Sequence, residues 1–184
     1  MLKYKLHLIC CFLSLLVLTI LPGTTALAHV SSDSMPDSVA EVEYSIFLEF
    51  KPNDLVVRNK LGMVYYRLNK LDEAEREFTR ILKADAKNSD ALDGLGLVKA
   101  ARNNYDQAVM YYIQAIALNP GDMMVYYHLG VALEKNGKFP EAAEAYRNAL
   151  AKWNEQYQAG TPNKKAVEFA ETVKAALHTV ESKL

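Results

Sequence analysis

The side chains that could carry out chemistry are few in this sequence and lie far apart. Cys10 and Cys11 fall inside an apolar stretch near the N-terminus, and no two of His29, His128 and His178 share the close spacing at which one helix presents a pair of metal ligands. The sequence contains no glycine-rich phosphate loop, no paired-carboxylate cleft and no nucleophile motif. Since catalysis needs such groups to converge in one pocket, the sequence predicts no enzyme and no cofactor or metal.

Asp54, Asn88 and Asp122 are the polar residues with the most regular spacing, since equal intervals separate them along the chain. Their oxygens could ligate a hard cation. The same side chains also accept hydrogen bonds from the free amides at the start of a helix. Pro52 and Pro120 lie two residues before Asp54 and Asp122, where a helix must stop. We therefore predict helix caps at these positions rather than metal ligands.

The same interval governs much of the chain. It separates Gly62 from Gly96 and Gly96 from Gly130, and leucine, alanine and aromatic positions repeat with these glycines: Leu61, Leu95 and Leu129; Ala40, Ala74, Ala108 and Ala142; Tyr44, Phe78, Tyr112 and Tyr146. Such a fixed period indicates one supersecondary unit that buries its apolar face by stacking on its neighbours.

Glycine inside a helix costs about 1 kcal/mol relative to alanine, so three glycines in register need a reason. Close approach of a second helix is the usual one. We expect the alanine twelve residues after each glycine to face that contact, and the aromatic residue four positions later to fill the adjacent volume. The polar segments 67–70, 102–104 and 135–138 are predicted turns between the two helices of each unit.

With these positions in place, the sequence resembles the tetratricopeptide repeat, which has a period of about 34 residues and a pattern of Leu-Gly, tyrosine, alanine, an aromatic residue and proline at fixed offsets. The resemblance implies an all-α, right-handed solenoid of helical hairpins. Three full repeats match, at residues 55–88, 89–122 and 123–156. We expect an N-terminal segment and half repeat at 29–54, and a linker and C-terminal capping helix at 157–184, with the linker running over 154–162 and Pro162 at the first helical position.

Binding in this family usually occurs on the concave surface, which is formed by the first helix of each repeat. Carried over position by position, the resemblance implies a partner-binding groove lined by Asn59, Met63, Tyr66, Arg67, Asp93, Leu97, Met124, Tyr127 and Val131. The positions at which heat-shock co-chaperones bind a C-terminal carboxylate hold Asn59, Met63, Gly94, Met124 and His128. We therefore predict that this carboxylate clamp is absent.

Two alternatives remain open for the groove. Its residues can belong to the core, or the apolar stripe of the C-terminal helix can fill the groove instead of capping the last repeat. That stripe follows a helical spacing of three and four residues and consists of Ala166, Phe169, Val173, Leu177 and Val180.

The N-terminus resembles a secretory signal peptide. Lys3 and Lys5 precede an apolar run from Leu8 to Leu21, and the small-residue pattern at 26–28 predicts cleavage after Ala28. The alternative is an uncleaved anchor, but the run is shorter than the ~20 residues that span a bilayer. Cleavage would remove both cysteines and two of the 21 basic residues, leaving 19 basic and 22 acidic residues and a net charge of −3.

We therefore predict an exported, periplasmic or secreted protein that contacts a membrane only through its signal segment. The mild negative charge gives no reason to expect nucleic acid. The resemblance implies a protein or peptide partner and two functions that the sequence separates poorly. One is an adaptor or scaffold for assembly of a cell-envelope complex, and the other is a chaperone-like binder of newly exported chains. A third possibility is a scaffold that self-associates into a homo-oligomer through the half repeat.

Overall fold

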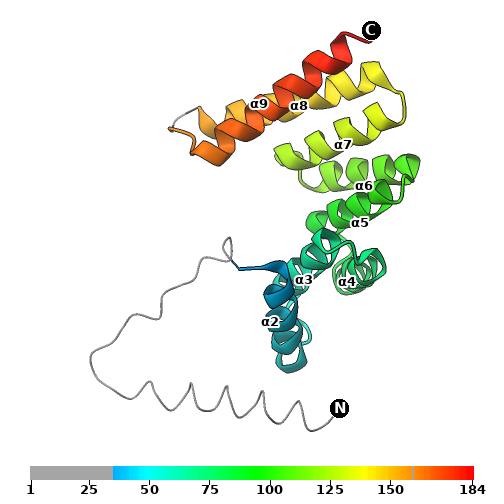
Figure 1. Cartoon of the computed structure of the whole chain (residues 1–184), viewed down its shortest axis with the longest axis vertical. Coiled ribbons are helices and arrows are strands. Elements are labelled where there is room, and N and C mark those ends of the chain that lie inside the picture. Colours follow the sequence, from blue (N-terminus) through cyan, green and yellow to red (C-terminus); the bar gives the residue numbers. More distant parts are fainter. Residues whose placement is uncertain (1–34, 159) are drawn as a thin grey trace. The chain divides into compact units, whose positions relative to one another are not determined.

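The computed structural model describes residues 35–158 and 160–184, and residues 36–184 form one compact unit. All regular secondary structure in these ranges is α-helical (Figure 1). The helices are α2 (Asp37–Phe50), α3 (Leu55–Arg67), α4 (Leu71–Ala84), α5 (Ser89–Ala101), α6 (Tyr105–Leu118), α7 (Met123–Lys135), α8 (Phe139–Tyr157) and α9 (Lys164–Glu181). The predicted signal segment and cleavage site lie outside the described residues.

Successive helices pack against one another in chain order (Figure 1). The helices α3 and α4, α5 and α6, and α7 and α8 form three hairpins. Helices α4 and α6 also pack on the first helix of the next hairpin, and α8 packs on α9. The first helices α3, α5 and α7 contact one another in turn. This arrangement confirms the predicted solenoid of helical hairpins.

The three predicted caps are confirmed. The Asp54 carboxylate accepts a hydrogen bond from the Val57 amide at 3.0 Å, and Asn88 and Asp122 do the same for the amides of Ala91 and Met124 at 3.0 and 2.9 Å. Each cap satisfies an amide that has no partner inside its helix. The polar residues with the most regular spacing thus set the helix starts.

The glycines in register lie against the aromatic residues of the second helices. A Cβ atom on Gly62 would lie 2.7 Å from the Phe78 ring, and one on Gly130 would lie 2.5 Å from the Tyr146 ring. Gly96 meets Tyr112 in the same way. The contact on the glycine is therefore the aromatic ring, whereas we expected the alanine; Ala74, Ala108 and Ala142 are fully buried beside it.

The predicted turns between paired helices contain a repeated backbone feature. Asn69, Asn103 and Gly137 have positive φ values of 57°, 60° and 75°, and the repeat interval separates each from the next. Asparagine and glycine are the residues that adopt this left-handed conformation most easily. The repeat therefore extends to the turn, although the residue type differs at the third one.

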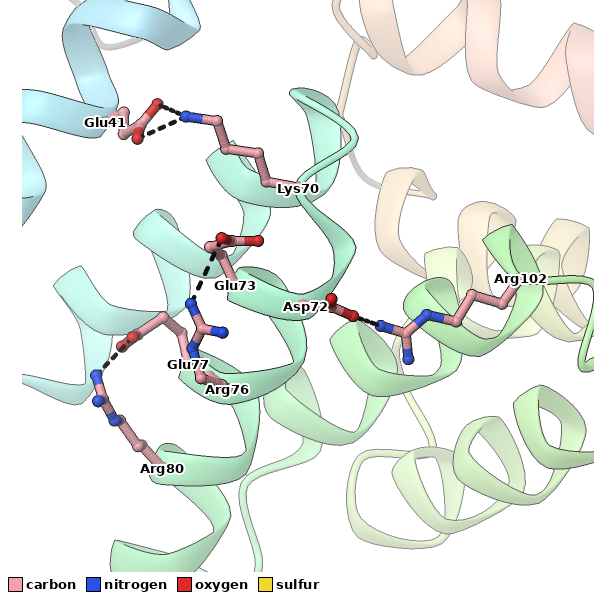
Figure 2. Close-up of polar contacts among 8 residues, drawn as sticks. All are labelled: Glu41, Lys70, Asp72, Glu73, Arg76, Glu77, Arg80 and Arg102. Atoms are coloured by element: carbon pink, nitrogen blue, oxygen red, sulfur yellow. Dashed lines mark hydrogen bonds and ion pairs between the residues drawn. The ribbon is translucent and has the colours of Figure 1, made fainter.

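The half repeat is present as α2, which packs on α3. Ala40 and Leu48 are buried. The Arg67 guanidinium donates to Asp37 at 2.6 Å. Figure 2 shows the second pair, in which the Lys70 ammonium donates to Glu41 at 2.7 Å. The hydrogen bond from Arg67 lowers the pKa of Asp37 below its ordinary value. Charged pairs thus join the half repeat to the first full repeat.

The C-terminal helix caps the last repeat, but the predicted linker is wrong at both ends. Helix α8 continues to Tyr157, and the cap of α9 is Asn163, whose side chain accepts from the Ala166 amide at 2.9 Å. The extension is stabilised by Trp153, whose ring contacts the Tyr157 ring in a tilted arrangement and whose indole nitrogen donates to the Ala166 carbonyl at 2.9 Å. These tertiary contacts override the polar composition of the segment.

Candidate partner-binding groove

The candidate groove lies on the first helices, and the structure distributes the nine predicted residues over all three. Helix α3 carries Asn59, Met63, Tyr66 and Arg67, helix α5 carries Asp93 and Leu97, and helix α7 carries Met124, Tyr127 and Val131. Because α3, α5 and α7 are neighbours (Figure 1), residues at the same repeat position form rows across them. One such row is Asn59, Asp93 and Tyr127.

The nine residues differ in how much surface they offer to a partner. Arg67 and Met124 are exposed, and Leu97 is buried with 9% of its surface accessible. The other six are half-buried. Met63 and Tyr66 pack against a core cluster that includes Phe78. The surface of these residues is therefore shared between the core and the groove.

Asp93 and His128 form a contact across two first helices that we did not predict from the sequence. The Nδ1 atom of His128 lies 2.8 Å from Oδ1 of Asp93, and the two side chains are 18% and 17% exposed. The sequence held a signal for it, since the two residues occupy adjacent repeat positions on neighbouring helices. Burial raises the pKa of Tyr66, and the negative charge of Asp93 adds to this effect.

Two polar residues of the predicted groove differ in whether their side chains already have a hydrogen-bond partner. Oδ1 of Asn59 is buried and accepts no hydrogen bond from any residue that the structure describes. Arg67, in contrast, already donates to Asp37 of α2. An unpaired buried acceptor is unfavourable, whereas a paired guanidinium has little left to offer a ligand.

Helix α9 closes the groove at the third repeat. The Phe169 ring contacts the Tyr127 ring edge-on at a centroid distance of 5.6 Å, and Tyr127 and Val131 pack against the cluster that holds Val173. Lys183 also pairs with Glu134 of α7 at 3.0 Å. Helix α9 therefore caps α8 and covers part of the α7 lining, which combines the two alternatives that the sequence left open.

The most exposed apolar side chains of the groove lie at the start of the first helices. Val56 on α3 is 68% exposed and Met124 on α7 is 40% exposed. Both occupy the second helical position of their repeats, and Asp90 takes that position on α5. This row is open to solvent on all three helices.

A second surface, on α4, is charged and internally paired. Arg76 pairs with Glu73 at 3.5 Å, Arg80 pairs with Glu77 at 2.7 Å, and Arg102, which directly follows α5, pairs with Asp72 (Figure 2). Glu77 is 6% exposed and also binds Arg58. Since its charges are matched within the molecule, this surface offers less to a partner than the groove does.

Neither a candidate metal site nor a membrane-spanning helix occurs among the residues that the structure describes. No group of three histidine, cysteine or acidic residues there could hold a metal ion. None of the described helices has both the length and the apolarity to cross a membrane. What the groove residues can do is pack against apolar side chains and exchange hydrogen bonds.

Comparison with known proteins identifies the family. The family model described as "Tetratricopeptide repeat" matches residues 59–108 and 94–157, a span of more than half of the chain. The chain belongs to the tetratricopeptide-repeat family. The helical hairpins, the glycine–aromatic contacts and the caps are thus the expected features of this repeat.

Curated relatives match part of this chain over a small part of their own length. The cytochrome c-type biogenesis protein CycH of Bradyrhizobium diazoefficiens is 31% identical over 122 residues, which cover 65% of this chain and 32% of the relative. The probable UDP-N-acetylglucosamine–peptide N-acetylglucosaminyltransferase SPINDLY of Arabidopsis thaliana is 32% identical over 82 residues, or 45% of this chain and 9% of that enzyme. The chain therefore spans less than a third of the length of these relatives, and the enzyme matches it over the repeats alone.

Solved structures with the same fold include PcrH of Pseudomonas aeruginosa and the translocator chaperone SycD. PcrH in complex with the chaperone-binding region of PopD superposes with a TM-score of 0.61 at 19% identity, covering 73% of this chain and 94% of PcrH. The type III secretion translocator chaperone SycD of Yersinia enterocolitica gives a TM-score of 0.62 at 20% identity, covering 72% and 86%. At this identity the likeness establishes the fold alone.

Proposed function

We propose that this protein is an exported, non-enzymatic adaptor that binds a peptide or helix of a protein partner in the groove of α3, α5 and α7, and so serves assembly of a cell-envelope complex. The observation that supports it most directly is the row of open side chains on three adjacent first helices, in which Val56 and Met124 are exposed. Apolar side chains at a groove are typical anchors for a partner helix.

Export rests on the N-terminal sequence, with Lys3 and Lys5 before an apolar run and a small-residue cleavage pattern that ends at Ala28. An envelope role agrees with the relative CycH, which is named for cytochrome c-type biogenesis. N-terminal sequencing of the protein recovered from its cells tests the export proposal. We expect a mature chain that begins at His29. Recovery of an unprocessed chain from the cytoplasm would contradict the export proposal.

The groove is tested by crosslinked capture with a matched pair of variants. Met124→Asp places a charge in the groove, whereas Met110→Asp places the same charge on α6 at a residue that is 61% exposed. We expect the wild type and Met110→Asp to capture the same one or two proteins and Met124→Asp to lose them. If Met124→Asp captures them unchanged, the groove is not the binding surface; loss with Met110→Asp alone would place the interface on α6.

A chaperone-like role is the second candidate. It is supported by the fold shared with PcrH and SycD, whose structures include complexes with a chaperone-binding region and with a translocator peptide. A chaperone should bind many unrelated unfolded chains and suppress their aggregation, whereas an adaptor should bind few. An aggregation assay with two unrelated clients separates the roles, because an adaptor has no effect on either client.

A further inference from the structure

At the second and fifth helical positions, the charged residues of the groove lie on its middle helix, α5. At the second helical position the three repeats hold Val56, Asp90 and Met124, and at the fifth they hold Asn59, Asp93 and Tyr127. Asp90 and Asp93 are three residues apart on α5, so they lie on the same face of that helix. The acidic groups are therefore flanked on both sides by uncharged side chains.

Within residues 35–158 and 160–184, no lysine or arginine pairs with Asp90 or Asp93. The contact that Asp93 makes is with His128, at 2.8 Å. The charge of Asp93 adds to the effect of burial in raising the pKa of the neighbouring Tyr66. The acids of α4 differ, since Asp72 and Glu75 both pair with Arg102.

The residues next to these acids have side chains that are exposed or lack a hydrogen-bond partner. Val56 and Met124 present 68% and 40% of their surface to solvent on either side of Asp90. Asn59 shares the row of Asp93, and its Oδ1 atom is buried without a hydrogen-bond donor among the described residues. Rotation of that amide toward a bound segment would provide the missing hydrogen bond.

We propose that the groove selects a segment of its partner in which a lysine or arginine lies between two apolar side chains. The basic group meets Asp90 and Asp93, and the apolar groups meet Val56 and Met124. The inference rests on the proposed function of the groove and adds the chemistry of its ligand, which is opposite in charge to the carboxylate bound by co-chaperones. Charge complementarity of this kind contributes mainly to specificity and to the rate of association.

The test is selection from a random 12-residue peptide library. The target is the protein purified from its own cells, in its naturally processed form, and the affinities of the enriched peptides are then measured. We expect enrichment of a basic residue flanked by apolar residues. Replacing that basic residue by glutamine should weaken binding about fivefold to tenfold, and the difference should shrink at high salt.

Protein variants supply the matched control. Asp90→Asn/Asp93→Asn should lose the preference for the basic peptide over its glutamine version. Glu141→Gln/Glu144→Gln removes two charges with the same spacing from exposed positions on α8 and should keep the preference.

The outcomes separate the two proposals. Enriched peptides that depend on Val56 and Met124 but show no basic preference, or that prefer acidic residues, would overturn this inference and leave the groove as the binding surface. If substitution of aspartate for Val56 or Met124 leaves binding of every enriched peptide unchanged, or no peptide is enriched, both the inference and the groove proposal are wrong. Melting temperatures of all variants verify that each remains folded.

Discussion

The first helices have two faces that follow opposite rules. The face toward the second helix repeats almost without change, with Gly62, Gly96 and Gly130 each against an aromatic ring. The groove face changes at every repeat, as the row Asn59, Asp93 and Tyr127 shows. The first face has one geometric solution, because a ring and a backbone must fit together. The groove face is constrained mainly by what it binds, so its residues distinguish this protein from others with the same repeat.

The largest effect is expected from Phe78→Ala, which removes a fully buried ring that contacts both Gly62 and Gly94. Truncating a buried phenylalanine typically costs about 3–5 kcal/mol in the free energy of unfolding. Urea denaturation followed by circular dichroism measures the loss. A loss below about 1 kcal/mol would show that the glycine–aromatic face is not the main source of stability.

Gly96→Ala tests the same face from the other side. The added methyl group would overlap the Tyr112 ring, and such overpacking costs about 1–3 kcal/mol, against a gain of ~1 kcal/mol from helix propensity. We expect a net loss in thermal stability. Gly121→Ala is the control, because its Cβ would meet only Asn119 at 3.6 Å. A more stable Gly96→Ala variant would contradict the close-packing explanation.

Glu75→Gln should have a smaller effect that depends on pH. Hydrogen bonds from Lys99 and then from Arg102 lower the pKa of Glu75 below its ordinary value of 4.5. A lowered pKa in the folded state means that the carboxylate stabilises the protein above pH 4.5 and that this contribution is lost as the pH falls through the folded pKa.

At pH 7 we therefore expect Glu75→Gln to lose about 1 kcal/mol of unfolding free energy. In strong acid the variant and the wild type should become equally stable, because Glu75 of the wild type is then protonated. Denaturation curves across the acidic range measure the difference. A gap that is constant with pH would mean that the ion pairs contribute nothing.

The smallest effect on stability is expected from the groove substitution Val56→Asp. The side chain is 68% exposed, and exposed substitutions usually change the unfolding free energy by less than about 0.5 kcal/mol. Its effect on partner capture should nevertheless be large, which is the reverse of the result for Phe78→Ala. A strongly destabilised Val56→Asp protein would show that the groove face also supports the fold, and the comparison of the two faces would not hold.

The positions that repeat were readable from the sequence because each has a local or periodic cause. The caps at Asp54, Asn88 and Asp122 follow from unpaired amides, and the glycines follow from the close approach of a ring. The linker before α9 was misread, since a run of polar residues gives no sign that Trp153 will hold the chain in a helix. The nine groove residues and the signal segment stay predictions, although the structure places all nine on the first helices.

By itself the sequence determined the all-α solenoid, the fixed period of its repeats and the helix starts, because these depend on contacts that recur at constant spacing. Only the tertiary structure decided how the groove is used within the molecule. It paired Asp93 with His128, tied Arg67 to Asp37 and set Phe169 against Tyr127. The period places these residues on neighbouring helices, but it does not show which of their side chains meet, because the residue types at these positions differ from repeat to repeat.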